Sequence, residues 1–536
     1  MRKSIKFRQI LFLIPILLLL ILKNYSYYWD GVDYAWQVEK APIQYLFHQH
    51  HLVYTPFMKL IYLGITDLGL NIRSIDLMIA LNIIAGLFYL VICYRLLKCI
   101  FSDYKYAAPA GTLLIGLSYT FATYWRNVDA YIIPLALTSL IMYRITRNGI
   151  QNLNVELLDW LLLLLATIFH QISILVLPAL VFAQYHSSSK NQKLRLLAII
   201  TVFFVSLSGL YLLTFHFMSP HLTHESFFKW VSGYAMGDYW IFKKVQGFPQ
   251  IVCLSLKESL SSNKALFLAP IKGWVLLSNE YVIYGNFKIF NFLSWVLFIF
   301  MSGAIIAGAI GMFSNRKSGF LAKFLFIWIA PFIILFQVFT PSNNFYRMFY
   351  LLPFVIFLLT FVAGILKTSF DKISGIVFII IFICFNFAFG FITESFPSSN
   401  QTLTYAKDVQ ELTSPRDLFI FSPSPDYQPR IYLNYFTDRD VFMIRHLPSR
   451  DRADLSDEQM KVVCNQSRKW LMDNYDNFYF SRGVVNYSDD YLEISTLDQN
   501  KKLPEMLVLH MSQIEIKEIT EITSYPFNHA DILEHK

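Results

Sequence analysis

The sequence is dominated by apolar runs, which short polar stretches separate. A helix needs roughly 20 apolar residues to cross the hydrocarbon core of a bilayer. Only 15% of the residues are charged, whereas soluble domains have about 25%. The pattern therefore predicts an all-α polytopic membrane bundle of about eleven transmembrane helices. We place these helices at 9–22, 76–98, 107–123, 129–145, 157–172, 172–186, 195–217, 288–312, 320–340, 347–366 and 373–393.

The fifth and sixth runs are continuous in the sequence, and we divide them at Phe169, His170 and Gln171, where we expect a tight outer turn. A single tilted helix is the alternative, and it would invert the orientation of every later span. The distribution of Lys and Arg favours the division, because a cytoplasmic N-terminus then places basic residues in each of the six inner loops. The short outer turns hold little beyond Arg126 and Arg347.

This orientation puts three regions outside the cytoplasm: a first outer loop at 24–75, a long outer loop at 218–287, and the tail. The first apolar run follows a basic head, as in a signal peptide. Bulky aromatic residues come next, without a small-residue cleavage pattern, so we expect an uncleaved span. We expect the long outer loop to lie partly on the membrane surface as an amphipathic helix. The prediction is a multi-pass protein of a bacterial inner membrane.

The tail differs in character from the rest of the chain, because it is charged and alternates strand and helix patterns. Strands are predicted at 417–422, 440–444, 477–483 and 506–511, with a short helix after the first and a longer one at 457–474. The tail therefore predicts a small extracytoplasmic α/β domain at 394–536, after a transmembrane domain at 1–393. It contains no glycine-rich phosphate loop, so we predict no nucleotide site.

Two aspartates open the first outer loop, in the stretch "YYWDGVDYAW". If this stretch is helical, the spacing of Asp30 and Asp33 puts both carboxylates on one face. A carboxylate at the membrane boundary must be hydrated, paired or functional. It can take a proton from a hydroxyl nucleophile, and we therefore predict that the pair is catalytic. The alternative is a polar cap beside aromatic anchors at the interface.

Three histidines follow in the same loop, at His48, His50 and His51. Imidazole can donate hydrogen bonds to phosphate or sugar oxygens, and it is a common metal ligand. We predict substrate contact here. The second alternative is a divalent metal site, for which this spacing alone is weak evidence. The third is that the histidines only pack a loop at the hydrated interface.

Polar residues in the other outer turns extend the predicted substrate-binding set. Arg126 and Asp129 lie among aromatic residues and fit either a sugar-facing rim or a helix cap. His170 lies in the turn between the fifth and sixth runs. Arg347 begins the tenth run, where a guanidinium matches phosphate oxygens bidentately or simply extends to the interface.

The acidic "DGVD" directly after the first span and the later "HHLVYTPF" resemble motifs of the GT-C superfamily of membrane glycosyltransferases. The pattern is most similar to the protein O-mannosyltransferase and aminoarabinose-transferase groups, in which an acidic motif and a His-Pro-Pro-Leu-like stretch occupy the first outer loop. Here Gly31 and Val32 separate the aspartates, and Pro56 is single. The resemblance adds Tyr54 to the predicted substrate-binding residues, and "PSNNFYRMFYLLP" is similar to the late segment that carries a basic residue near the donor phosphate.

The resemblance implies a specific reaction. The donor would be a sugar on a polyprenyl phosphate, and the acceptor a hydroxyl of a protein, lipid or glycan. One aspartate, preferably Asp30, would act as base in a single inverting displacement. Arg347 and the histidines would stabilise the leaving phosphate. No nucleic-acid partner is predicted, because the basic residues lie in short clusters between apolar runs.

Three other functions are compatible with parts of the sequence. A transporter or flippase would place polar groups near the membrane midplane, whereas the acidic residues here gather at one edge. A lipid-linked glycan polymerase or ligase of another fold would share the substrates and the location. A non-enzymatic scaffold would use its tail for binding, and it would not need the side chains of Asp30 and Asp33.

Overall fold

The computed structural model describes most of the chain, and all structural statements below concern these residues. They are 14–147, 153–187, 190–218, 226–232, 288–338, 348–365, 377, 380–387, 391–397, 400–421, 427–446, 456–481, 491–496, 507–510, 516–518 and 532–535. The chain forms two compact units. We call Met1–Asn24, Ile43–Ile72 and Asp76–Ser395 the helical unit. We call Tyr25–Pro42, Arg73–Ile75 and Phe396–Lys536 the α/β unit.

The first outer loop is therefore shared between the two units. Its beginning, Tyr25–Pro42, and its end, Arg73–Ile75, belong with the C-terminal part of the chain, while Ile43–Ile72 belongs with the helices. The sequence alone assigns the whole loop to the membrane domain. The physical reason for the difference is a set of buried hydrogen bonds between side chains distant in the sequence, which we describe below.

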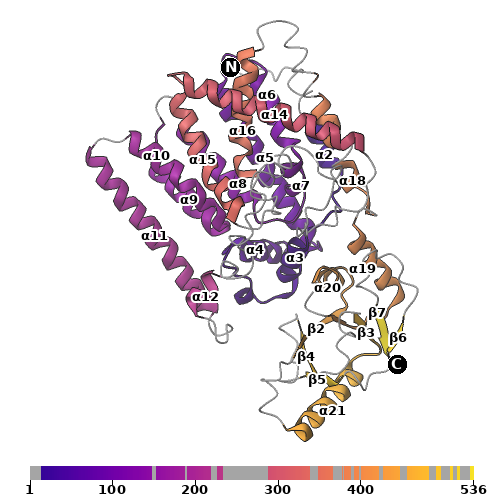
Figure 1. Cartoon of the computed structure of the whole chain (residues 1–536). Helices are drawn as coiled ribbons and strands as arrows, with labels where there is room; N and C mark the ends of the chain where they lie inside the picture. The colour runs from indigo at the N-terminus through magenta and orange to yellow at the C-terminus, as the bar shows by residue number, and fades with distance from the viewer. Residues whose placement is uncertain are drawn as a thin grey trace. The chain divides into compact units, whose positions relative to one another are not determined.

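The helical unit is built from the apolar runs that the sequence shows (Figure 1). Its longer helices are α5 (Ser74–Ile100), α8 (Ile132–Thr146), α9 (Leu157–Phe169), α10 (Leu177–Ser187), α11 (Lys190–Met218), α14 (Lys288–Ser314), α15 (Gly319–Val338) and α16 (Met348–Ile365). Shorter helices are α2 (Ile14–Ile21), α6 (Ala107–Gly116), α7 (Tyr119–Tyr124), α12 (Phe227–Ser232) and α18 (Ile392–Glu394).

Within the described residues, three helices are long and apolar enough to cross a membrane: Ser74–Ile100, Lys193–Met218 and Val296–Ser314. Several others are apolar but shorter, among them Leu157–Phe169 and Gly319–Leu335. The architecture is thus a largely helical membrane-type fold with a small sheet. The count of eleven spans and the side of the membrane on which each loop lies stay predictions.

The break expected between the fifth and sixth runs is present in the structure. Helix α9 ends at Phe169, and His170 has an extended backbone with φ −157° and ψ 122°. A 3₁₀ helix, η2 (Gln171–Val176), then leads into α10. The His170 side chain accepts a hydrogen bond from the Ile172 N–H at 3.2 Å, which satisfies a donor at the start of the new helix.

Close packing of two helices explains why a glycine lies within α14. This helix packs against α16, and a Cβ atom added at Gly308 would lie 1.8 Å from the Phe357 carbonyl oxygen. Only a residue without a side chain allows the two backbones to approach this closely, as in the small-residue interfaces of membrane helices. The contact fixes how the later helices pack.

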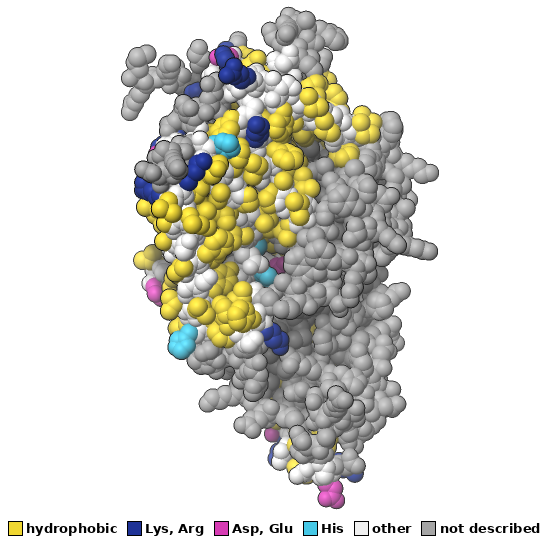
Figure 2. Space-filling view, turned by 60° about the vertical axis from the view of Figure 1, so that its left-hand side comes forward, with side chains coloured by type: hydrophobic (Ala, Val, Ile, Leu, Met, Phe, Trp, Pro, Cys, Tyr) yellow, Lys and Arg dark blue, Asp and Glu magenta, His cyan; other side chains and the backbone are white. Residues whose placement is uncertain are grey.

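One face of the helical unit is broadly apolar, as Figure 2 shows. Helices α9, α10, α11 and α15 gather on the left of Figure 1, and leucines of α9 and α11 have exposed side chains, for example Leu194 at 74% and Leu213 at 69%. Apolar side chains that lack protein neighbours fit contact with acyl chains rather than with water.

In the part of the α/β unit that the structure describes, seven strands form a sheet in the order β5-β4-β2-β1-β3-β7-β6. Its strands are β1 (Leu418–Phe421), β2 (Asp440–His446), β3 (Phe478–Ser481), β4 (Tyr491–Thr496), β5 (Leu507–His510), β6 (Ile516–Glu518) and β7 (Ile532–His535). Strand β1 is parallel to both β2 and β3, and the other pairs are antiparallel.

Two crossover helices connect the parallel strands. Helix α20 (Tyr427–Phe436) joins β1 to β2, and α21 (Asp457–Asn474) joins β2 to β3. All four residues of β1 are buried, as expected for a central parallel strand. Helix α19 (Gln401–Leu412) precedes the sheet, and α3 (Trp29–Lys40) packs against α20. The strands predicted at 417–422, 440–444, 477–483 and 506–511 correspond to β1, β2, β3 and β5.

Candidate functional site

The predicted acidic pair lies on helix α3, within the α/β unit. The stretch is helical, so the i, i+3 spacing places Asp30 and Asp33 on one face, as predicted. Asp30 is in the first turn, where a carboxylate interacts favourably with the helix dipole. Val32, Ala35 and Val38 form the opposite face and are fully buried.

The two carboxylates have different environments. Burial raises the pKa of Asp30 to about 7, and the neighbouring Asp33 carboxylate adds to this effect. Asp33 accepts a hydrogen bond from Gln37 Nε2 at 2.8 Å, one turn along the helix. A carboxyl group with a pKa near neutrality is suited to exchange a proton with a substrate at physiological pH. Asp30 is therefore the better candidate for a catalytic base.

The three predicted histidines form a small hairpin in the helical unit. The His51 N–H donates to the His48 carbonyl at 3.1 Å, and the two rings stack with centroids 4.4 Å apart. The His50 N–H donates to His48 Nδ1 at 3.2 Å, and the rings of His48 and His50 are 5.1 Å apart. A tight turn therefore concentrates three imidazoles in one place.

Helices from later in the chain hold this hairpin in position. The Gln171 N–H donates to the His50 carbonyl at 2.8 Å, and the Gln171 side chain is hydrogen-bonded to His50 Nδ1. The Tyr211 hydroxyl of α11 donates to the Gln49 carbonyl at 2.8 Å. Leu52 packs with Tyr211 and Trp230 in a common apolar cluster. The hairpin is thus anchored by both η2 and α11.

Four further polar or aromatic residues join the histidine hairpin. His170 lies 6.3 Å from His51 between ring centroids, and Tyr131 lies 4.2 Å from His170. Tyr54, at the start of α4 (Tyr54–Asp67), lies 6.2 Å from His51. Burial first and then the charge of Asp129 raise the pKa of the Tyr54 hydroxyl well above its usual value. We call His48, His50, His51, Tyr54, Asp129, Tyr131 and His170 the histidine cluster.

The turn that supplies Asp129 is held by a buried amide. Asn82 Nδ2, on α5, donates to the Asn127 carbonyl at 2.8 Å and to the Asp129 carbonyl at 2.9 Å. Asn82 is fully buried, so these bonds satisfy a donor that would otherwise be costly to bury. Tyr54 and His170, which the sequence predicted separately, therefore lie near His51, and Asp129 lies near Tyr54.

The imidazoles of the cluster are uncharged at neutral pH. Burial lowers the pKa of His48, His51 and His170 well below the usual 6.5, and neighbouring histidines lower it further. A neutral imidazole still offers one N–H donor and one acceptor nitrogen. Histidine side chains are visible in a hollow of the apolar face in Figure 2. The cluster can therefore hydrogen-bond a polar ligand without itself carrying charge.

This chemistry predicts an acid-sensitive protein. Below pH 6.5 the unfolded chain binds protons at these histidines while the folded chain does not, so the unfolding free energy falls by about 1.4 kcal/mol per pH unit for each such histidine. The loss begins near pH 6.5 and stops once pH falls below the folded pKa values. We expect the melting temperature in detergent to drop between pH 7 and pH 5.

A variant makes this measurement specific. His51→Gln removes one titrating ring of the cluster, so its melting temperature should depend less on pH than that of the wild type. His186→Gln, outside the cluster, is the matched control and should keep the wild-type slope. An equal slope in His51→Gln and wild type would contradict the assignment.

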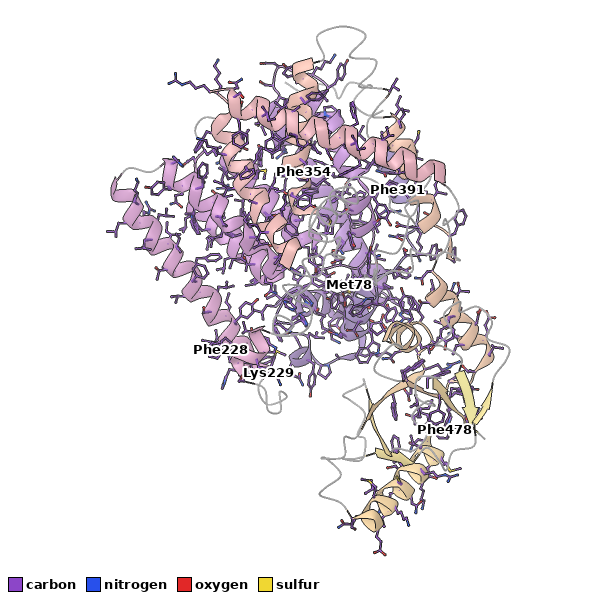
Figure 3. The ribbon with its side chains drawn as sticks, viewed as in Figure 1. Met78, Phe228, Lys229, Phe354, Phe391 and Phe478 are labelled. Carbon is purple, nitrogen blue, oxygen red and sulfur yellow. The ribbon has the colours of Figure 1, made fainter. Side chains whose placement is uncertain are left out.

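Arg126 belongs to a different buried arrangement. Its Nη2 lies 3.4 Å from Glu394 Oε2, and these side chains are only 2% and 0% exposed. Its Nε donates to the Ala122 carbonyl at 2.8 Å, and its Nη1 donates to the Leu22 carbonyl at 3.0 Å. Phe391, labelled in Figure 3, places its ring 5.4 Å from the guanidinium carbon. The structure thus surrounds Arg126 with protein groups.

Sequence reasoning missed several charged residues that the structure buries, among them Glu394 and Lys59. Glu394 accepts hydrogen bonds from the Tyr119 hydroxyl at 3.0 Å and from Arg126. Lys59 lies on the buried face of α4 together with Tyr54, Thr55 and Met58, and is 9% exposed. Thr55 is one turn from Lys59, and its hydroxyl is buried without a hydrogen-bond partner among the described residues. The sequence does hold one signal for a buried charge here, because Lys59 is a single lysine within the apolar stretch "YTPFMKLIYLGI".

Two further predictions concern a basic residue and a metal ion. Arg347 lies outside the described residues. Among the residues that the structure describes, no group of three or more His, Cys, Asp or Glu is arranged to hold a metal ion. The four histidines of the cluster are thus close together but not in a ligand geometry.

Comparison with known proteins gives the fold. No protein-family model and no curated protein matches the chain. The crystal structure of ArnT from Cupriavidus metallidurans bound to undecaprenyl phosphate matches with a TM-score of 0.56 and 10% identity, over 99% of this chain and 98% of that one. The apo structure matches with a TM-score of 0.55 and 9% identity, over 98% and 97%.

An archaeal oligosaccharyltransferase, AglB from Archaeoglobus fulgidus, matches less well, with a TM-score of 0.46 and 12% identity over 94% of this chain and 76% of that one. The two ArnT matches show a mostly helical membrane-protein fold, which is the kind of fold that the resemblance to the GT-C superfamily implies. More particularly, the chain shares the fold of ArnT, an aminoarabinose transferase, from end to end. The sequence resemblance to this superfamily is confirmed at the level of the fold.

Proposed function

We propose that this protein is an integral-membrane glycosyltransferase that moves a sugar from a polyprenyl-phosphate donor to an acceptor hydroxyl on the extracytoplasmic side. One observation carries the proposal. The chain has the fold of ArnT, a protein whose structure was solved with undecaprenyl phosphate bound, and it buries His51 and His170 together with Tyr54 and Asp129. Polar side chains are costly to bury in a membrane protein, and they mark functional sites there.

The donor phosphate needs hydrogen-bond donors and a cation, because it gains negative charge as the sugar leaves. The histidine cluster supplies neutral N–H donors. We propose that Lys59 supplies the positive charge, since it is a buried lysine of α4, the helix that begins at Tyr54. Arg347 is the second candidate, from its sequence position alone.

The acceptor needs a base, and we assign this role to Asp30. The acceptor oxygen forms a bond to the anomeric carbon while the bond from that carbon to the phosphate oxygen breaks. The proton of the hydroxyl passes to Asp30, and the bonding pair leaves with the phosphate. A single displacement inverts the anomeric centre and passes through an oxocarbenium-like transition state.

A transfer assay with a lysine variant tests the proposal. Purified protein in vesicles receives a radiolabelled sugar on polyprenyl phosphate and an extract of envelope glycans, lipids and proteins. We expect the wild type to transfer label and Lys59→Met to transfer about a hundredfold less, the usual effect of removing one group that stabilises a developing anion. Lys59→Arg should keep part of the activity.

The control is Lys323→Met, which removes an exposed lysine of α15 and should transfer like the wild type. A flippase would move the donor across the vesicle membrane without forming a new glycoside. Movement without transfer by the wild type would therefore reject the proposal in favour of transport.

A further inference from the structure

We propose that Tyr435 of α20 is a positioning residue, which holds the acidic helix α3 in place so that Asp30 and Asp33 keep their catalytic orientation. The inference deepens the proposed function and rests on it. It gives the C-terminal part of the chain a defined role, which is to form the support of a helix that lies about 400 residues earlier in the sequence.

The Tyr435 hydroxyl is the centre of a hydrogen-bond network. It donates to Glu39 Oε1 at 3.0 Å, near the end of α3. It also accepts from the Ile75 N–H at 3.1 Å and lies 3.3 Å from Ser74 Oγ. Ser74 Oγ in turn donates to the Ala35 carbonyl of α3 at 2.7 Å. One phenol therefore connects α20, the C-terminal half of α3 and the first residues of α5.

Arg73 also belongs to this network, because it contacts both Glu39 and Tyr435. Its Nε donates to Glu39 Oε1 at 3.0 Å, and its Nη2 donates to the Tyr435 carbonyl at 2.7 Å. The guanidinium carbon lies 4.2 Å from the centre of the Tyr435 ring, which adds a cation–π contact. The Ser74 N–H also donates to Glu39 Oε1, at 2.8 Å. Glu39 is only 9% exposed, so these bonds are largely shielded from water.

A second set of contacts holds the chain that leads into α3. The Tyr432 hydroxyl of α20 donates to the Tyr27 carbonyl at 2.6 Å. Asn400 Nδ2 donates to the Tyr25 carbonyl at 2.7 Å. The rings of Tyr27 and Phe436 stack with centroids 5.7 Å apart. The acidic helix is thus fixed at both ends by residues from the C-terminal part of the chain.

Helix α3 has its packed residues and its catalytic candidates on opposite faces. Val32, Ala35 and Val38 lie on the buried face, and Glu39 follows on the same side. Asp30 and Asp33 lie on the opposite face, where Gln37 donates to Asp33. No contact of Tyr435 with either aspartate is needed. Its effect passes through the rigid helix, whose rotation or tilt would move both carboxylates together.

The experiment compares two tyrosine-to-phenylalanine variants of the full-length protein. Tyr435→Phe removes the hydroxyl at the centre of the network. Tyr475→Phe is the matched control, because it removes a hydroxyl that donates to Asp440 at 2.9 Å in the same unit, without touching α3. Two properties are measured: hydrogen exchange of the backbone amides of α3, and steady-state kinetics across pH.

We expect Tyr435→Phe to increase exchange across Trp29–Lys40 and to lower kcat about tenfold or more, with the acceptor KM within about twofold of the wild type. The acid limb of its pH–rate profile should also move, because a displaced helix changes the surroundings of Asp30. Tyr475→Phe should match the wild type in amide exchange, kcat, acceptor KM and pH–rate profile. If Tyr435→Phe does not accumulate, Ser74→Ala removes the hydrogen bond to Ala35 and serves in its place.

The outcomes separate this inference from the proposed function. Wild-type exchange and kcat in Tyr435→Phe, or equal losses in Tyr475→Phe, would overturn the positioning role while leaving the transferase standing. If the wild type shows no sugar transfer, the proposed function fails, and the exchange data alone decide whether Tyr435 orders α3.

Discussion

Replacing Asp30 by Asn is expected to reduce sugar transfer by about a thousandfold, with the protein still folded and abundant. A general base contributes about 10²–10⁴ to the rate, and an amide of the same shape cannot accept the proton. The side chain changes little in volume, so the packing of α3 should persist. Transfer from a radiolabelled polyprenyl-phosphate sugar, normalised to protein abundance, measures the effect.

The pKa of Asp30 adds a signature that a structural role would not produce. A base acts only when deprotonated, so kcat/KM should rise with pH and level off above about 7, the pKa to which burial and Asp33 raise this carboxyl. Asp33→Asn removes the neighbouring charge. It should therefore shift the rise to lower pH and reduce the plateau less than Asp30→Asn does.

Asp67→Asn is the control, since Asp67 is an exposed residue at the end of α4 and should transfer normally. If Asp30→Asn is folded and transfers like the wild type, Asp30 is not the base. If Asp33→Asn alone is inactive, the role passes to Asp33. Full activity of both variants would leave the glycosyltransferase proposal without its base.

Removing Glu394 is expected to destabilise the helical unit by about 3–5 kcal/mol, because it leaves the Arg126 guanidinium buried without its carboxylate partner. Glu394→Leu should therefore lower the melting temperature in detergent and reduce the amount of folded protein. Arg126→Met should have a similar effect, because Glu394 is completely buried. The double variant Arg126→Met/Glu394→Leu should recover much of the loss, since neither charge then remains in the interior.

An exposed ion pair in the same unit is the control. Lys23 and Asp76 lie 3.9 Å apart with about half of each side chain exposed, at 54% and 50%. Asp76→Asn should cost less than about 1 kcal/mol, because water screens such pairs. Additive losses in the Arg126 and Glu394 double variant would show that the two charges do not interact, contrary to the structure.

Local patterns in the sequence predicted much of the fold. The apolar runs correspond to helices because a helix satisfies its own backbone hydrogen bonds, which a membrane requires. The break at His170 and the strands β1, β2, β3 and β5 also follow from short-range signals. Strands β4, β6 and β7 were missed. Their pairing partners lie elsewhere in the chain, and β6 has only three residues, too few for a clear alternation.

The candidate site likewise has a part that follows from short-range sequence signals and a part that depends on long-range contacts. The sequence placed Asp30 and Asp33 on one helical face and gathered three histidines in one loop, because both results depend on residues less than five positions apart. It could not show that Lys59 is buried. It also could not find the partner of Arg126, since Glu394 lies 268 positions away.

By itself, then, the sequence determined the largely helical membrane fold and the positions of most of its apolar helices. Only the tertiary structure decided that Tyr54 and His170 lie near His51, that Asp129 lies near Tyr54, and that α3 belongs with the C-terminal sheet. The reason is physical: secondary structure follows from the periodicity of neighbouring residues. Assembly depends on hydrogen bonds and packing between segments far apart in the chain, such as Tyr435 with Glu39, which no local pattern encodes.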